Sequence, residues 1–229
     1  MIRIHLPPAP AHYESQVLIP GLSFLAANPH PSGDDWNGHH EWRHIHDYLY
    51  SELRGVCAYC ATYTPRRPEP RSIDHTSIDH FVPKSLPPYV QAYEWANFRL
   101  CRARLNHRKG NFQDVIDPCH IQNGWFRLNF RTFALSPDPN LLEPQKQRVR
   151  DTITRLELND DDAYVNERAR AIYGYADGKL PFDNLARHYP FIAAEMTSQN
   201  FDLAHLPTFK GLLKNPRLRS ALTRQGWLA

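Results

Sequence analysis

The sequence predicts an α+β protein that is mainly helical, with a small core that contains two strands. Apolar residues recur at three- and four-residue steps over residues 35–54 and again beyond Leu141, a spacing typical of helices with one buried face. Prolines and glycines divide the region between them into short segments that suit strands and turns. Hydrophobic residues make up 41% of the 229 residues, which is enough for a packed core.

The N-terminal part is predicted as an extended arm over residues 1–34, followed by one helix. Prolines crowd Leu6–Pro10 and Asn28–Pro31, and proline disfavours the interior of a helix. From Asp35 to Arg54 the apolar residues follow helical spacing, and Gly55 ends the pattern. We therefore expect a single amphipathic helix over this segment.

Residues 35–118 are predicted to hold this helix and the strand-containing core. Thr64–Arg71, rich in proline and arginine, suits an exposed loop before the first strand. Pro83–Tyr93 would be the connection between the strands, and Glu94–Leu100 would lead into the second. Arg102–Gly110 is predicted as a short helix that ends at its glycine.

Residues 119–229 are predicted as an aromatic strand region followed by a helical elaboration. The aromatic stretch from Trp125 to Phe133 partly alternates, which favours a strand packed on the core; stacking of these rings on unpaired bases is the alternative. The later helices are expected from Leu141 through Leu156, over Asp162–Tyr175, over Ala186–Met196 and over Pro207–Leu222.

Two segments of the central region combine residues that suit phosphodiester hydrolysis. Ser77–Ser85 read S-I-D-H-F-V-P-K-S, and Asn97–Gly110 read N-F-R-L-C-R-A-R-L-N-H-R-K-G. This reaction needs a base that deprotonates water and a cation that stabilises charge on the leaving oxygen. Adjacent strand residues point to opposite faces, so Asp79 can ligate a metal while His80 takes the proton. An amide oxygen from Asn106 would complete an oxygen-rich site that suits Mg²⁺ or Mn²⁺.

In their order and spacing, these residues resemble the HNH endonucleases, whose ββα-metal core is two strands and a helix around one metal ion. The resemblance covers Val56–Asn111 and implies that such a core is embedded in the mainly helical chain. It implies that Asp79 and Asn106 are metal ligands, that His80 is the general base, and that Asn97 ties the loop and orients the histidine. The residues that carry it are Asp79, His80, Pro83, Asn97, Asn106, Lys109 and Gly110, with Cys57 and Cys60 upstream.

The Asp-His pair occurs twice in this region, as Asp74-His75 and as Asp79-His80. Only the second pair is followed by two apolar residues and Pro-Lys-Ser, so we assign catalysis to it. The first pair is interpreted as polar residues on the segment that enters the strand, although His75 could still reach a phosphate or the outer shell of the metal.

The cysteines leave two alternatives open. Cys57 and Cys60 have the two-residue spacing with which one turn presents two thiolates to zinc. Many HNH proteins complete this site with a second Cys-x-x-Cys pair, whose positions here hold Arg102 and Leu105. Either Cys57, Cys60 and Cys101 bind zinc with a fourth ligand among Cys119, His107 and His120, or the site has decayed. We favour decay, with Leu105 packed inward and Arg102 turned outward to solvent or phosphate.

The charge distribution suits a nucleic-acid partner. The net charge is only +3, but positive residues crowd the predicted catalytic helix and its entry. Lysine and arginine bind phosphates without sequence specificity, so these residues are predicted to contact nucleic acid. The predicted contact residues are Lys84, Arg99, Arg102, Arg108 and Lys109. A second basic group, from Lys210 to Arg224, could equally be a solvated helix face.

These observations together favour a metal-dependent HNH endonuclease, with DNA preferred to RNA as its substrate. The alternatives are an RNase of the same fold and a non-catalytic nucleic-acid-binding or assembly module. The sequence shows no signal peptide or apolar run of membrane-spanning length, so a cytoplasmic protein without disulfides is expected. Thr152–Asn159, with Arg168 further on, resembles the region after the nuclease core in the HNH subunit of Septu-type antiphage systems. That resemblance implies a role in bacterial defence beside an ATPase partner.

Overall fold

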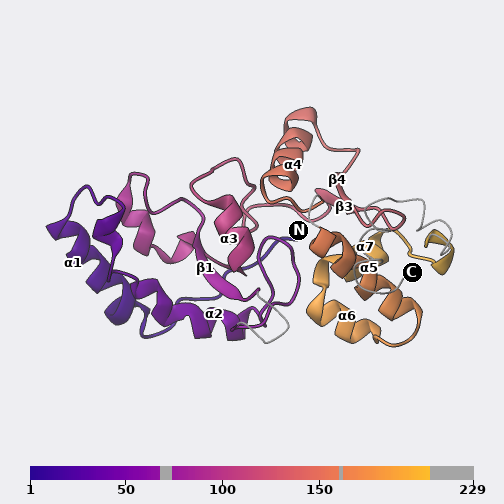
Figure 1. Ribbon diagram of the computed structural model, residues 1–229, viewed down its shortest axis with the longest axis horizontal. Coiled ribbons are helices and arrows are strands. Elements are labelled where there is room, and N and C mark those ends of the chain that lie inside the picture. The colour runs from indigo at the N-terminus through magenta and orange to yellow at the C-terminus, as the bar shows by residue number, and fades with distance from the viewer. Residues whose placement is uncertain (68–73, 160–161, 207–229) are drawn as a thin grey trace. The chain divides into compact units, whose positions relative to one another are not determined.

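The computed structural model describes residues 1–67, 74–159 and 162–206, and the chain divides into two compact units (Figure 1). The first unit is Arg3–Ile121; the second begins at Gln122 and includes Met1 and Ile2. The described residues contain helices and small antiparallel sheets, so the predicted α+β class is confirmed. The sequence placed a boundary after residue 118, close to this division.

The first unit begins with a helical segment where the sequence predicted an extended arm. A π-helical turn, η1 (Glu14–Leu18), continues into α1 (Ile19–Ala27). The prediction is therefore wrong for these residues. Pro20 lies in the first turn of α1, where a helix needs no backbone N–H from it, and the proline groups that suggested an arm flank this helix on both sides.

The single helix predicted over Asp35–Arg54 is three shorter elements. These are η2 (Asp34–Trp36), η3 (Glu41–Ile45) and α2 (His46–Glu52). Gly38 adopts a φ of +86° between the first two, a conformation that a helix cannot contain. The apolar pattern nevertheless identified buried residues, because Trp42, Ile45 and Leu49 all belong to the core of this unit.

The centre of the first unit is an antiparallel strand pair with a helix packed on it. Strands β1 (Thr76–His80) and β2 (Phe98–Arg102) pair with Asp79 opposite Arg99 and His80 opposite Phe98. Helix α3 (Ala103–Lys109) follows β2 directly, packs on both strands and ends at Gly110. Figure 1 shows α3 beside β1. The connection between the strands contains the short turns η4 (Tyr89–Tyr93) and η5 (Trp95–Asn97).

The second unit has its own strand pair, β3 (Phe126–Leu128) and β4 (Leu135–Pro137). The alternating apolar side chains of this stretch are buried, as are Phe130 and Phe133 beyond β3. Core packing, rather than stacking on bases, therefore explains the aromatic pattern.

The described helices of the second unit follow this strand pair. They are α4 (Glu143–Arg155), α5 (Asp162–Ala176), α6 (Phe182–His188) and α7 (Pro190–Ser198), followed by the turn η6 (Leu203–His205). One helix was predicted over Ala186–Met196, but two occur, because Pro190 starts a new helix and Tyr189 before it is not helical. The predicted helix Pro207–Leu222 and the basic group from Lys210 to Arg224 lie outside the described residues.

Asn159 and Arg168, which belong to the Septu-type likeness, make hydrogen bonds within the second unit. The side chain of Asn159 accepts a hydrogen bond from Leu135 N and donates one to Leu135 O, both at 2.7 Å. Arg168, which is buried, donates from Nε to Phe133 O at 2.7 Å and from Nη2 to Leu158 O at 2.9 Å. These bonds connect the segment after α4 and helix α5 to strand β4 and to Phe133, two residues before that strand.

Over the described ranges, no helix combines the length and the apolar character needed to cross a membrane.

Candidate active site

Asp79 lies inside the first unit with both of its carboxylate oxygens hydrogen-bonded. Only 2% of the residue is exposed. The hydroxyl of Tyr59 donates to Oδ2 at 2.5 Å, and Nζ of Lys109 donates to Oδ1 at 3.1 Å. Burial raises the pKa of the Asp79 carboxyl, whereas Lys109 and Tyr59 act in the opposite direction. Burial also raises the pKa of Tyr59 well above its usual value, so its hydroxyl remains a donor.

Helix α3 brings Asn106 and Lys109 to strand β1. The two residues are three positions apart and so share one face of the helix. Nδ2 of Asn106 donates to Ser77 Oγ and to Ile78 O, both at 3.2 Å. Nζ of Lys109, in addition to its bond with Asp79, donates to His80 O at 2.8 Å. The two predicted metal ligands, Asp79 and Asn106, are therefore both placed where α3 packs on β1.

The imidazole of His80 has different neighbours from Asp79, the residue before it. Its Nε2 lies 3.0 Å from Ala92 O, and its ring makes edge contacts with Trp42 and Phe98 at centroid distances of 4.5 and 5.4 Å. A carbonyl oxygen only accepts, so Nε2 carries the hydrogen and Nδ1 keeps the lone pair. Burial lowers the pKa of His80 to about 3, so the ring is neutral at neutral pH.

Asn97 closes the loop that follows His80. Its Oδ1 accepts from Val82 N at 2.7 Å, and its Nδ2 donates to Val82 O at 2.9 Å and to Gln91 O at 2.8 Å. A backbone bond from Phe81 N to Asn97 O, at 2.9 Å, adds to this closure. Because Gln91 precedes Ala92, the same amide also fixes the segment whose carbonyl contacts His80.

Three of the five residues predicted to contact nucleic acid lie in the interior, so that prediction is wrong for them. Arg99, Arg102 and Lys109 are buried, and each makes hydrogen bonds inside the unit. A guanidinium or ammonium group with these partners is not available to a phosphate. Lys84 and Arg108 remain partly exposed, and Lys84 Nζ lies over the ring of Trp36 at 4.5 Å from its centroid.

Residues 57–60, which include Cys57 and Cys60 and are called the cysteine turn below, lie against strand β2. Cys57 Sγ accepts from Arg102 N at 3.3 Å, while Cys101 Sγ lies 3.7 Å from Ser77 Oγ. Burial acts to raise the pKa of Cys57, but hydrogen bonds from Cys60 and Arg102 outweigh this effect and lower it. Burial raises the pKa of Cys101 well above its usual value, which keeps that thiol neutral. Within the described ranges, no three His, Cys, Asp or Glu side chains gather as a metal-holding group.

The two positions of the missing cysteine pair are occupied in different ways. Leu105 is fully buried, as the decayed version of the zinc site predicts. Arg102 was expected to turn outward, and this is wrong: its Nε donates to Thr64 Oγ1 at 2.8 Å and its Nη2 to Tyr63 O at 3.2 Å. The arginine therefore connects β2 to the segment after the cysteine turn.

We expect purified protein to contain no stoichiometric zinc. A structural zinc site needs four ligands, and the positions of the second cysteine pair hold Arg102 and a fully buried Leu105. Elemental analysis of the metal content per chain, before and after dialysis against a chelator, tests this expectation. One tightly held zinc per chain, lost with unfolding of the protein, would contradict it.

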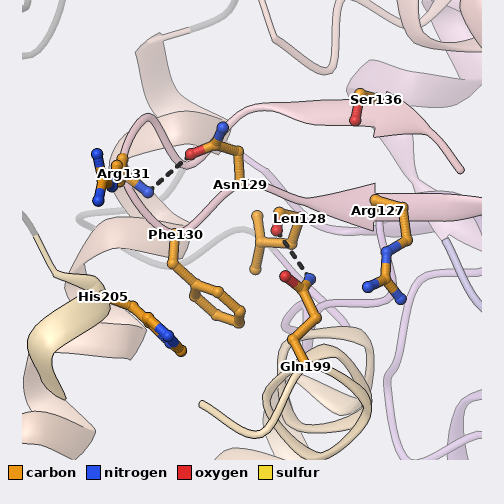
Figure 2. A pocket seen from close by; sticks show the side chains of 8 residues that line it. All are labelled: Arg127, Leu128, Asn129, Phe130, Arg131, Ser136, Gln199 and His205. Carbon is orange, nitrogen blue, oxygen red and sulfur yellow. Dashed lines mark hydrogen bonds between the residues drawn. The ribbon is translucent and has the colours of Figure 1, made fainter. Parts of the chain in front are cut away.

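The second unit contains a pocket of about 370 Å³ beside the strand pair β3–β4 (Figure 2). Several of its polar groups already bond within the unit. Gln199 Nε2 donates to Leu128 O at 2.9 Å, and Asn129 Oδ1 accepts from Arg131 N at 2.8 Å. The guanidinium of Arg127 lies 3.5 Å from Asp138 and 3.8 Å from Glu195, which balance its charge. We assign no ligand to this pocket.

Comparison of the sequence with protein-family models and with curated proteins gave no match.

Sequence reasoning missed Tyr59, although its position is recognisable in the sequence. It stands with Ala58 between the cysteines of C-A-Y-C, and the spacing of the cysteines indicated zinc rather than a role for the tyrosine. No local pattern relates Tyr59 to Asp79, which is 20 positions further along the chain.

Proposed function

We propose that this protein is a metal-dependent endonuclease of the HNH class that hydrolyses phosphodiester bonds. One observation carries the proposal: β1, β2 and α3 place Asp79 and Asn106 where the helix packs on the strand, with His80 directly after Asp79. The clamp that Asn97 forms on the loop after His80 supports it, because a base must be held in a fixed position to act.

His80 is the proposed general base. Its Nε2–H is held by Ala92 O, so Nδ1 is the nitrogen that accepts the proton of the attacking water. Because the pKa is about 3, the ring is already neutral at the pH at which it must act, but it is a weak base. A substrate phosphate near the ring would raise this pKa, because negative charge favours the protonated imidazole.

The residues of the candidate metal site fit a hard cation such as Mg²⁺ or Mn²⁺. A carboxylate has about four lone-pair positions, so one hydrogen bond on each oxygen of Asp79 leaves further positions open. Outer hydrogen bonds of this kind are usual on carboxylates that bind metal. Asn106 uses its Nδ2 in the bonds to β1, which leaves Oδ1 as the atom that can bind a metal ion. When bound there, a divalent cation would stabilise negative charge on the phosphate and on the leaving oxygen.

The substrate and partner are further parts of the proposal. We favour DNA over RNA, with Lys84 and Arg108 as the partly exposed cations that contact phosphates. A cytoplasmic role in antiphage defence beside an ATPase subunit rests on the Septu-type likeness of Thr152–Asn159 and Arg168.

Incubation with supercoiled plasmid, single-stranded DNA and tRNA tests the function directly. Each substrate is combined with Mg²⁺, Mn²⁺ or EDTA, and the His80→Ala protein serves as the control for contaminating nucleases. We expect the wild-type protein to cleave DNA with a divalent metal and not with EDTA. Cleavage of tRNA alone would identify an RNase, and no cleavage of any substrate would contradict the proposal.

Asn106→Ala should raise the Mn²⁺ concentration needed for half-maximal cleavage by about tenfold or more. Even residues that only hydrogen-bond to a metal ligand typically change metal affinity by about 10–100-fold when they are mutated. Asn106 is partly exposed and makes only two neutral bonds at 3.2 Å, so the fold should survive the change. Asn106→Asp retains an oxygen ligand and should need no more metal than the wild type. An unchanged metal requirement in Asn106→Ala would remove Asn106 from the site.

A further inference from the structure

The cysteine turn is fixed to strand β2 by its backbone. Ala58 N donates to Leu100 O at 2.8 Å, and Arg102 N donates to Cys57 Sγ at 3.3 Å. Within the turn, Ala61 N donates to Cys57 O at 2.9 Å. These bonds determine the direction in which the second of the two residues between the cysteines points.

That residue, Tyr59, points into the core and ends at the candidate metal ligand. Its side chain is fully buried, and its hydroxyl donates to Asp79 Oδ2 at 2.5 Å. Lys109 approaches the other carboxylate oxygen from α3. The carboxylate is thus held between two donors that come from different parts of the unit.

We propose that Tyr59 is the positioning residue of the metal site, and that the C-A-Y-C turn serves to deliver its hydroxyl to Asp79. The proposal rests on the proposed nuclease function. With both oxygens hydrogen-bonded, the carboxylate cannot rotate freely, and the lone pairs that remain keep a fixed direction. This role would give the cysteine turn a function at the site that does not depend on the second cysteine pair, whose positions hold Arg102 and Leu105.

The experiment compares Tyr59→Phe with Tyr13→Phe in the full-length protein. Each variant loses one hydroxyl that donates a buried hydrogen bond of 2.5 Å. The hydroxyl of Tyr59 donates to Asp79 Oδ2, and that of Tyr13 donates to Tyr93 O. Mn²⁺ binding without nucleic acid is measured by calorimetry, and cleavage is measured over a range of Mn²⁺ concentrations. We expect Tyr59→Phe to weaken Mn²⁺ binding by about 10–100-fold, the usual effect of losing an outer hydrogen bond on a metal ligand. Tyr13→Phe should bind Mn²⁺ as the wild type does.

Several outcomes separate this proposal from the proposed function. If the wild type binds Mn²⁺ and cleaves, and Asn106→Ala weakens binding while Tyr59→Phe does not, the role of Tyr59 is overturned and the nuclease stands. If the wild type neither binds Mn²⁺ nor cleaves, both are overturned. Should Tyr59→Phe fail to fold, Tyr59→Gln, which keeps a donor, is compared with Tyr59→Met, which does not. Equal Mn²⁺ affinity of these two variants would also overturn the role of Tyr59.

Discussion

Replacing His80 with alanine should lower the rate of phosphodiester cleavage by about 10²–10⁴-fold, the usual contribution of a general base. The change removes the nitrogen that accepts the proton from water but leaves Asp79 and Asn106 in place. The loss should therefore appear in the maximal rate at saturating Mn²⁺, and not in the Mn²⁺ concentration that gives half of that rate. Initial rates on plasmid DNA at several Mn²⁺ concentrations measure both quantities.

His75→Ala is the matched control for this prediction. His75 belongs to the first Asp-His pair. Its buried Nδ1 has no hydrogen-bond partner, so His75→Ala removes no hydrogen bond of that atom. The ring of His80 packs on Trp42 and Phe98, so thermal unfolding must show that His80→Ala remains folded at the assay temperature. Equal losses of rate in the two variants would show that catalysis was assigned to the wrong pair. A folded His80→Ala protein with the wild-type rate would exclude His80 as the base.

The sequence predicted those elements whose signal is local. The second strand and the helix after it were found because Asn97, the basic run and Gly110 follow one another without interruption. The buried face of α4 was found from the helical spacing of Val149, Ile153 and Leu156. The N-terminal helix was missed because the prolines on either side of it hid its short apolar pattern.

The positive charges show what local reasoning could not determine. A run of arginine and lysine in a sequence indicates exposed cations, because burial of a charge is costly unless a partner neutralises it. The partners of Arg99 and Lys109 are Asp117 and Asp79, which lie 18 and 30 positions away. The packing of α3 on β1 brings Lys109 to Asp79, and the segment after α3 brings Asp117 to Arg99. The sequence therefore predicted a phosphate-binding surface where the structure has internal ion pairs.

Arg99→Ala should destabilise the first unit by about 3–5 kcal/mol, the typical effect of removing one member of a buried ion pair. Arg99 is only 2% exposed, and its Nε and Nη2 donate to the two oxygens of Asp117 at 2.9 and 2.6 Å. Its Nη1 also donates to Ala96 O and Phe98 O, both at 2.7 Å. Hydrogen bonds and the charge of Arg99 outweigh burial and lower the pKa of Asp117, so alanine at position 99 leaves a buried carboxylate without its main counter-charge.

Equilibrium unfolding in urea measures this loss, with Arg108→Ala as the control for the removal of a partly exposed arginine from the same unit. The double variant Arg99→Met/Asp117→Leu removes both charges and fills much of their volume with apolar atoms. It should be more stable than Arg99→Ala, because the penalty of the single change comes from the unpaired charge more than from the lost attraction. If both arginine variants lost the same small amount of stability, Arg99 would be a surface residue, and the predicted phosphate-binding role would return to it.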